Sequence, residues 1–266
     1  MLSLVMAAQI SDPIVREGII LCRSILPQEY VRKWKSVIDS RYHDLEIARR
    51  NGDTTNITPL TGIRERFVPT ASSFTVGALT HEGEISELLD SVSNGIAGLW
   101  IKNILGWRLL CNLDQSWVRR QYAPSRYPPL HAPHGWHQDG ALKFDFQSHQ
   151  NGDFPHNATL NMVTCWIALD FCGLDAPGLE LITERLGGLL SPSALRTESL
   201  QTRFTSTRFW RPTLQPGDAL LFRGDILHRT HVIPEMTKDR TSIELRFFSA
   251  VSIPDRLQAD RFISFG

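Results

Sequence analysis

The stretch LQPGDALLFRGDILH, residues 214–228, places a turn, a short apolar run and a histidine in one continuous segment. Its QPGD portion contains the proline and glycine that favour a tight turn between two strands. The apolar run ALLF that follows is typical of a short buried strand. We therefore expect a strand that starts at a turn and leads toward His228 at its far end.

A second strand pattern begins at Arg240, where polar and apolar side chains alternate. Successive residues of a strand point to opposite faces of a sheet, so each set shares one face. The polar set is Arg240, Ser242, Glu244 and Arg246, and the apolar set is Ile243, Leu245 and Phe247. If the polar face looks into a barrel, Arg240 can hold a dicarboxylate, because a planar guanidinium pairs well with a carboxylate. For Arg246, farther along the strand, we favour a salt bridge with an acidic neighbour.

Around these two segments, the chain divides into a helical first part and a β-rich second part. Helices are predicted at residues 27–50 and 84–104, after a strand at 18–22 and on either side of a polar loop. Strands are predicted at residues 107–113, 117–122, 159–170, 179–182, 209–214, 219–222 and 241–251. This order predicts an α+β protein, mainly β, whose helical N-terminal part (1–106) buttresses a β-core (107–251). We expect residues 1–266 to form a single domain.

The composition excludes several classes of partner. The chain has 266 residues, with 28 Lys and Arg against 28 Asp and Glu, so its formal net charge is zero. It therefore lacks the excess of basic residues that is typical of nucleic-acid-binding proteins. Four arginines at residues 196–211 are interpreted as solvated loop charge rather than as a site for an anionic substrate. The sequence shows no membrane-spanning run, no signal peptide and no C-x-x-C pair among its four cysteines. We expect a soluble cytoplasmic protein whose partner is a small molecule.

The segment GWHQDG at residues 135–140 contains the most distinctive chemistry. If it forms a strand, His137 and Asp139 present an imidazole and a carboxylate to the same face. With a third ligand from a distant strand, they would form the 2-His-1-carboxylate set that leaves positions open on Fe(II). His228 is the candidate third ligand. The H-x-D spacing alone also arises by chance in a chain with nine histidines.

A zinc cluster is the alternative interpretation of the histidines before this segment. His131 and His134 precede His137 closely. However, Pro133 and Gly135 disfavour a helix in this segment, and no second pair of cysteines or histidines completes a zinc site. His131 and His134 are therefore interpreted as residues of a solvated loop.

Several motifs, in their order along the chain, resemble the phytanoyl-CoA dioxygenase family. They are GWHQDG at 135–140, TCWIALD at 164–170, PGLELI at 177–182, PGD at 216–218 leading to His228, and Arg240. The resemblance extends over residues 18–248 and is specific from residue 136 onward. It implies a double-stranded β-helix, or jelly-roll, core of the cupin-like type. It also implies a mononuclear non-heme iron enzyme that consumes 2-oxoglutarate and dioxygen, with ascorbate as a possible stimulant.

The resemblance also implies roles for individual residues. His137, Asp139 and His228 would be the Fe(II) ligands, and no further catalytic residue is expected. Arg240 would pair with the distal carboxylate of 2-oxoglutarate, supported by Thr230.

Two more residues are assigned to 2-oxoglutarate by this resemblance. Trp166 would approach it from the facing strand, although the apolar sequence around Trp166 favours core packing equally. Gln121, on the strand before the metal motif, is proposed from its position alone.

The implied reaction is the oxidation of a C–H bond in a small organic molecule, with release of succinate and carbon dioxide. Related halogenating enzymes have a small residue in place of the carboxylate ligand, so the presence of Asp139 favours hydroxylation or another oxidation. A biosynthetic tailoring or catabolic step is expected, and the substrate is not specified. The alternative is a non-catalytic jelly-roll binding module, which would have little reason to keep all of these residues.

Overall fold

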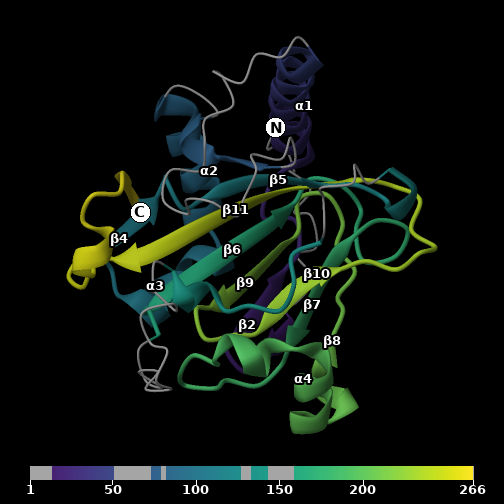
Figure 1. Cartoon of the computed structure of the whole chain (residues 1–266). Coiled ribbons are helices and arrows are strands. Elements are labelled where there is room, and N and C mark those ends of the chain that lie inside the picture. The colour runs from purple at the N-terminus through teal and green to yellow at the C-terminus, as the bar shows by residue number, and fades with distance from the viewer. Residues whose placement is uncertain (1–13, 51–72, 79–81, 127–132, 143–158, 266) are drawn as a thin grey trace, which may run out of the picture.

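The computed structural model describes residues 14–50, 73–78, 82–126, 133–142 and 159–265, and two antiparallel β-sheets form its centre (Figure 1). The larger sheet contains β1 (Ile14–Arg16), β2 (Ile19–Cys22), β3 (Ser73–Thr75), β4 (Leu109–Asn112), β5 (Trp117–Gln121), β6 (Met162–Ala168), β9 (Ala219–Arg223), β11 (Arg240–Ser249) and β12 (Phe262–Phe265). The smaller sheet contains β7 (Gly178–Ile182), β8 (Phe209–Trp210) and β10 (His228–His231). Most of the polar loop expected before residue 81, and His131, lie outside the described residues.

Four α-helices and six single turns of 3-10 helix accompany the sheets in the described ranges. The α-helices are α1 (Gln28–Arg50), α2 (Glu82–Ser93), α3 (Ile96–Leu105) and α4 (Thr197–Arg203). The 3-10 turns are η1 (Val76–Ala78), η2 (Pro124–Arg126), η3 (Asp139–Ala141), η4 (Pro192–Leu195), η5 (Ser206–Arg208) and η6 (Asp255–Leu257). None of the described helices combines the length and hydrophobicity that a membrane span requires.

The larger sheet is organised around β11. Its main strand order is β1-β2-β9-β6-β11-β4-β12, and β5, which also carries β3, pairs with the first half of β11. The smaller sheet has the order β10-β7-β8. Side chains of both sheets share one buried cluster, to which Trp166 and Phe222 contribute from the larger sheet and Leu181 from the smaller. Two antiparallel sheets facing each other in this way form a jelly roll, which confirms the predicted double-stranded β-helix core.

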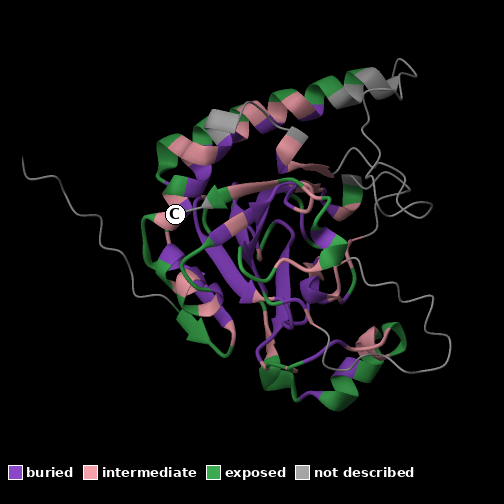
Figure 2. Ribbon diagram, turned by 90° about the vertical axis from the view of Figure 1, so that its left-hand side faces the viewer, coloured by how far each residue is buried: buried purple, intermediate pink, exposed green. Residues whose placement is uncertain are grey.

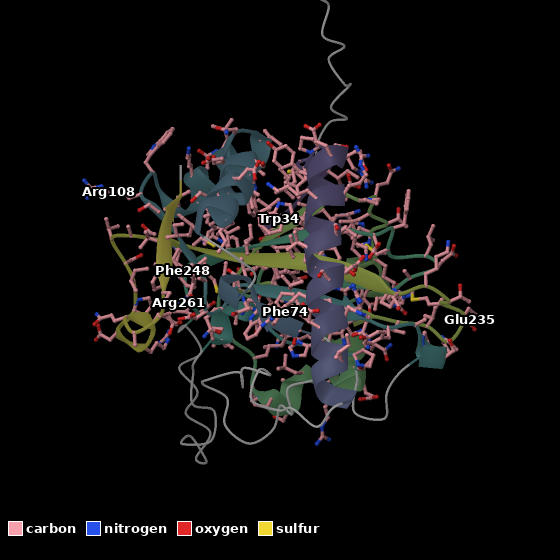
Figure 3. The ribbon with its side chains drawn as sticks, turned by 90° about the horizontal axis from the view of Figure 1, so that it is seen from above. Trp34, Phe74, Arg108, Glu235, Phe248 and Arg261 are labelled. Carbon is pink, nitrogen blue, oxygen red and sulfur yellow. The ribbon has the colours of Figure 1, made fainter. Side chains whose placement is uncertain are left out.

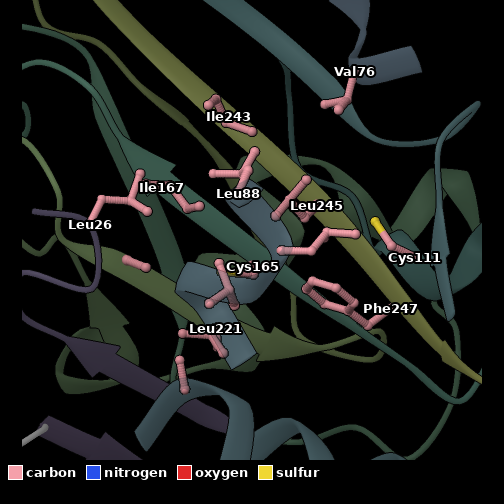
Figure 4. Close-up of a cluster of buried hydrophobic side chains, with 14 of the residues drawn as sticks. Leu26, Val76, Leu88, Cys111, Cys165, Ile167, Leu221, Ile243, Leu245 and Phe247 are labelled. Carbon is pink, nitrogen blue, oxygen red and sulfur yellow. The ribbon is translucent and has the colours of Figure 1, made fainter. Parts of the chain in front are cut away.

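The alternation in β11 separates the apolar outer face of the larger sheet from its polar inner face. Ile243, Leu245 and Phe247 are fully buried on the outer face, where they pack with Leu88 of α2 and Val76 (Figure 4). Because side chains alternate along a strand, the polar set that begins at Arg240 points into the barrel. The buried residues concentrate in the strands, and exposed ones cover the outer sides of the helices (Figure 2).

Helices α1, α2 and α3 cover the outer face of the larger sheet, and α1 crosses its strands (Figure 3). Helix α4 instead packs beside the smaller sheet, where Leu200 joins a cluster with Ile182 and Phe209. Trp34, Ile38 and Tyr42 of α1 are fully buried, as expected for one stripe of an amphipathic helix. The single helix predicted at residues 84–104 is wrong, because Gly95 adopts an extended conformation (φ −150°, ψ −166°) that ends α2 and caps α3. The spacing of apolar residues gives no sign of this break, because α2 and α3 pack against the same hydrophobic core.

The strand predicted at residues 209–214 is also shorter than expected, since β8 ends at Trp210. Pro212 follows shortly after and has no amide hydrogen to donate to a neighbouring strand. The strand predicted at 159–170 begins at Met162 instead of residue 159 and ends at Ala168.

Candidate metal centre

The backbone brings His137 and His228 together. The His137 amide donates to the His228 carbonyl at 3.0 Å, and the His228 amide donates to the His137 carbonyl at 3.1 Å. This isolated antiparallel bridge places the two imidazole rings 4.1 Å apart, centroid to centroid. His228 is the first residue of β10 and lies opposite Leu181 of β7, on the inner face.

The segment around Asp139 does not form the strand in which His137 and Asp139 would share a face. Only His137 pairs with a strand, and Asp139 begins the 3-10 turn η3. The turn forms because Gly140 packs directly against another stretch of backbone and donates its amide to the Gly224 carbonyl at 2.8 Å. A Cβ atom on Gly140 would lie 2.7 Å from that carbonyl oxygen, so the position requires glycine. The turn still directs the Asp139 carboxylate toward both histidines.

The side chains of His137, Asp139 and His228 each offer one ligand atom, and these atoms all lie within 4.8 Å of one another. The Asp139 carboxylate is 3.9 Å from Nε2 of His137 and 3.8 Å from Nε2 of His228. Each Nδ1 lies close to a backbone carbonyl, that of Gly135 at 2.7 Å and that of Ile226 at 3.1 Å. With hydrogen on Nδ1, both Nε2 atoms keep their lone pairs for a metal.

Burial and neighbouring charges set the protonation of this cluster. Desolvation and the nearby His228 lower the pKa of His137 to about 3, so its ring is neutral at pH 7. Burial alone would raise the pKa of Asp139, but Arg246 and the two histidines hold it below its usual range. The cluster therefore presents a carboxylate and a neutral imidazole at neutral pH, the donor types that bind a divalent first-row metal.

Both oxygens of the Asp139 carboxylate are hydrogen-bonded within the protein. The Thr164 hydroxyl donates to Oδ2 at 2.6 Å, and the Arg246 guanidinium donates to Oδ1 at 2.7 Å. Arg246 also donates to Glu244 at 2.6 Å. The salt bridge predicted for Arg246 is therefore present, but sequence reasoning did not identify Asp139 as its partner because 107 residues separate the two.

Arg240 lies on the same inner face and has a different environment. Its side chain is buried, its guanidinium donates to the Ser242 hydroxyl at 2.6 Å, and it stands 4.9 Å from the centre of the Trp166 ring. Its Nε has no hydrogen-bond partner, and no carboxylate of the described chain pairs with it. Desolvation lowers the pKa of Arg240 to about 10, which still leaves it charged at neutral pH. A buried cation without a counter-ion fits an anionic ligand.

The remaining predicted residues lie around Arg240 and His228. Trp166 contributes to the apolar cluster and also stacks under Arg240, so the structure accommodates both interpretations of it. Thr230 is opposite Leu179 in the smaller sheet, which places it on the inner face two residues after His228. Gln121 is the backbone partner of Arg240 across the β5–β11 ladder.

His134 is a residue whose place the sequence did not reveal. It is partly buried, and its Nδ1 lies 3.3 Å from Nε2 of His137, with the two rings edge to face. Its carbonyl accepts a hydrogen bond from the Thr230 amide at 2.9 Å, which keeps it beside β10. The nearby His137 and burial lower its pKa well below the ordinary value. The interpretation of His134 as a solvated loop residue is therefore wrong.

The four arginines at residues 196–211 are all exposed. Two of them form ion pairs on the outer side of the smaller sheet: Arg211 contacts Glu180 at 2.7 Å, and Arg208 contacts Glu184 at 3.5 Å. Glu180 is fully buried and also binds Arg229 at 2.6 Å.

Comparisons with known proteins identify the fold. The chain matches no protein-family model and no curated protein sequence. Among solved structures, it is similar to EctD from S. alaskensis with bound Fe, at 14% identity and a TM-score of 0.62, over 88% of this chain and 73% of that one. It is also similar to the non-heme alpha ketoglutarate dependent epimerase SnoN from nogalamycin biosynthesis, at 16% identity and a TM-score of 0.53, over 88% and 80% of the two chains.

A third similar structure is the non-heme alpha ketoglutarate dependent carbocyclase SnoK, also from nogalamycin biosynthesis. Its identity is 13% and its TM-score 0.54, over 88% of this chain and 81% of that one. At such identities the likeness is one of fold. According to their descriptions, SnoN and SnoK are non-heme alpha ketoglutarate dependent enzymes, and the EctD structure contains bound Fe.

Proposed function

We propose that this chain is a non-heme Fe(II)- and 2-oxoglutarate-dependent oxygenase of the phytanoyl-CoA dioxygenase type. It oxidises a C–H bond of a small organic molecule, most directly by hydroxylation, and releases succinate and carbon dioxide. One observation carries the proposal: the inner face of the barrel holds a compact His137, Asp139 and His228 cluster together with Arg240, a buried cation that pairs with no carboxylate among the described residues.

The residues present fit both groups that this chemistry needs. The cluster offers two imidazole nitrogens and one carboxylate, the set that leaves open positions on Fe(II). The orphaned Nε of Arg240 and its guanidinium offer donors to the far carboxylate of 2-oxoglutarate. Both groups lie on the inner side of the same barrel, and the proposal requires that one bound dicarboxylate engages both.

When bound, Fe(II) with 2-oxoglutarate and dioxygen would supply the oxidising chemistry. The chain's own residues would bind and orient. His137, Asp139 and His228 would hold the metal, while Arg240 would fix the distal carboxylate of the co-substrate, with Thr230 beside it. Trp166 limits the motion of Arg240 by stacking against it, and the buried walls of the barrel exclude water.

The solved structures of similar fold support this proposal by analogy. One EctD structure contains 2-oxoglutarate and 5-hydroxyectoine, and another contains Fe. SnoN was also solved with Fe3+ and alpha ketoglutarate, and both it and SnoK come from the biosynthesis of nogalamycin. This favours a small organic substrate and a tailoring step for the present chain.

An anaerobic titration tests the proposal. Fe(II) followed by 2-oxoglutarate is expected to produce the weak visible charge-transfer band of the chelate, which Asp139→Ala should abolish. When oxygen is admitted, iron-dependent formation of succinate from 2-oxoglutarate should follow, even without substrate. If the wild-type protein gives neither band nor succinate, a non-catalytic jelly-roll binding module becomes the better account.

A further inference from the structure

Four charged side chains form a continuous chain of ion pairs across the inner face of the larger sheet. Arg119 donates to Glu244 at 2.9 Å, Arg246 donates to the other oxygen of Glu244 at 2.6 Å, and Arg246 also donates to Asp139 at 2.7 Å. Glu244, Arg246 and Asp139 are buried, while Arg119 is partly exposed. The formal charges of the four side chains cancel.

The guanidinium of Arg246 is fixed on several sides. One amino group donates to the Gln115 carbonyl at 2.8 Å, and the other is shared between Glu244 and Asp139. The backbone amide of Arg246 is held in turn by the Ser116 hydroxyl at 3.0 Å. Because these contacts come from β11 and from the turn between β4 and β5, Arg246 cannot follow the Asp139 carboxylate if that carboxylate rotates.

We infer that Arg246 is a positioning residue that makes Asp139 a one-oxygen metal ligand. A divalent cation and a guanidinium repel each other, so the Arg246-bound Oδ1 is the poorer site for the metal. Each oxygen lies near one histidine: Oδ1 is 3.9 Å from Nε2 of His137, and Oδ2 is 3.8 Å from Nε2 of His228. The charge of the partner separates them, since Oδ2 accepts from the neutral Thr164 hydroxyl. The metal would therefore bind Oδ2. This inference rests on the proposed function, because it concerns the same metal site.

The consequence concerns the positions left open on the metal. A carboxylate that binds through both oxygens occupies two positions, whereas one that binds through a single oxygen occupies one. With two histidines and one oxygen of Asp139, a six-coordinate ion keeps three positions for other ligands. Arg246 thus protects the position that a chelating 2-keto acid and dioxygen need, and Glu244 keeps Arg246 in place.

The first test uses Mn(II) as the probe, because water-proton relaxation reports the number of water molecules bound to it. Arg246→Met is expected to bind Mn(II) with one fewer water than the wild type. In the Fe(II) complex, the 2-oxoglutarate concentration needed for half of the charge-transfer band should rise by about 10-fold or more. Arg211→Met is a matched control, since it also breaks an ion pair with a buried carboxylate, Glu180, but does not contact Asp139.

A merely structural role for Arg246 predicts a different result. In that case the folded Arg246→Met protein would melt at a lower temperature but keep the wild-type number of waters and the wild-type response to 2-oxoglutarate, which overturns the inference. If Arg246→Met does not fold, Arg246→Lys replaces it, because lysine keeps the charge but cannot span Gln115, Glu244 and Asp139 together. Failure of the wild type itself to bind Fe(II) and 2-oxoglutarate would instead refute the proposed function.

Discussion

Arg240 and Arg246 are two buried arginines on the same face of the same strand, yet their surroundings are opposite. Arg246 is paired with two carboxylates, Asp139 and Glu244. Arg240 has a serine hydroxyl and a tryptophan ring but no carboxylate of the described chain. The same residue type in the same pattern therefore has two different surroundings. The difference lies in two carboxylates, that of Asp139 from a distant turn and that of Glu244 two residues away on β11.

The difference shows two ways in which a protein interior can accommodate a buried guanidinium. A paired arginine such as Arg246 organises side chains that are already present, and its removal leaves buried carboxylates uncompensated. An arginine without a carboxylate partner in the described chain, such as Arg240, is expected to lower the stability of the protein and to recover this free energy if an anion binds. The predictions below test this contrast, beginning with the metal that both arginines are proposed to serve.

The largest effect is expected from His228→Ala. Arg240 and Arg246 are proposed to act on a metal site that loses one of its three protein ligands when His228 is removed. Succinate formation should therefore fall by more than about 100-fold. The measurement is iron-dependent turnover of 2-oxoglutarate. His231→Ala is the control, because His231 lies on the same strand with its side chain on the opposite face. Wild-type turnover in His228→Ala would contradict the assignment of the ligands.

Arg246→Met should lower the free energy of unfolding of the metal-free protein by about 3–5 kcal/mol, because Asp139 and Glu244 lose a shared buried partner. Urea unfolding followed by circular dichroism measures this change. A loss below about 1 kcal/mol would show that the two carboxylates do not depend on Arg246.

Arg240→Met should have the opposite effect on the empty protein. Replacing an unpaired buried cation with an apolar side chain of similar volume is expected to leave the free energy of unfolding unchanged or raise it by about 1 kcal/mol. Binding of 2-oxoglutarate should weaken by about 100-fold, which corresponds to about 2.7 kcal/mol. Urea unfolding and the Fe(II)-dependent band measure the two quantities. If Arg240→Met strongly lowered the free energy of unfolding, Arg240 would stabilise the fold as Arg246 does, and the proposed difference between the two arginines would be wrong.

The smallest effect is expected at the outer end of the ion-pair chain. Burial raises the pKa of Glu244, but Arg119 and Arg246 more than offset this and hold it below its usual range. A lowered pKa stabilises the fold above the unfolded value of about 4.3, and this stabilisation is lost as the pH falls. Because Arg119 is partly exposed, Arg119→Gln should cost only about 1 kcal/mol at pH 7, and its effect should shrink as the pH falls below that value. Equal losses at pH 7 and pH 3 would contradict this account.

Much of the barrel could be predicted because its strands alternate with a period of two residues. The pattern that begins at Arg240 separates the inner and outer faces correctly, since one face packs on apolar helices and the other does not. The motif order predicted the jelly roll, and the three residues assigned as metal ligands do lie together. Their role as ligands, and those of Thr230 and Gln121, stay predictions.

The features that were not predicted depend on contacts between distant residues or on local backbone. The turn that begins at Asp139 forms because two glycine-containing segments meet, and neither segment shows this by itself. His134 approaches His137 because its carbonyl pairs with β10. The break between α2 and α3 comes from the conformation of Gly95 and interrupts no hydrophobic period.

The ion pair between Asp139 and Arg246 also has a consequence for the order of folding. Its partners are 107 residues apart, and β11, which carries Arg246, is the penultimate strand of the described chain and the centre of the larger sheet. Contacts of such long range form late, because the intervening chain must first lose its freedom. The carboxylate is therefore oriented only after the sheet has closed, so that the proposed metal binding would follow the completion of the barrel and would not guide it.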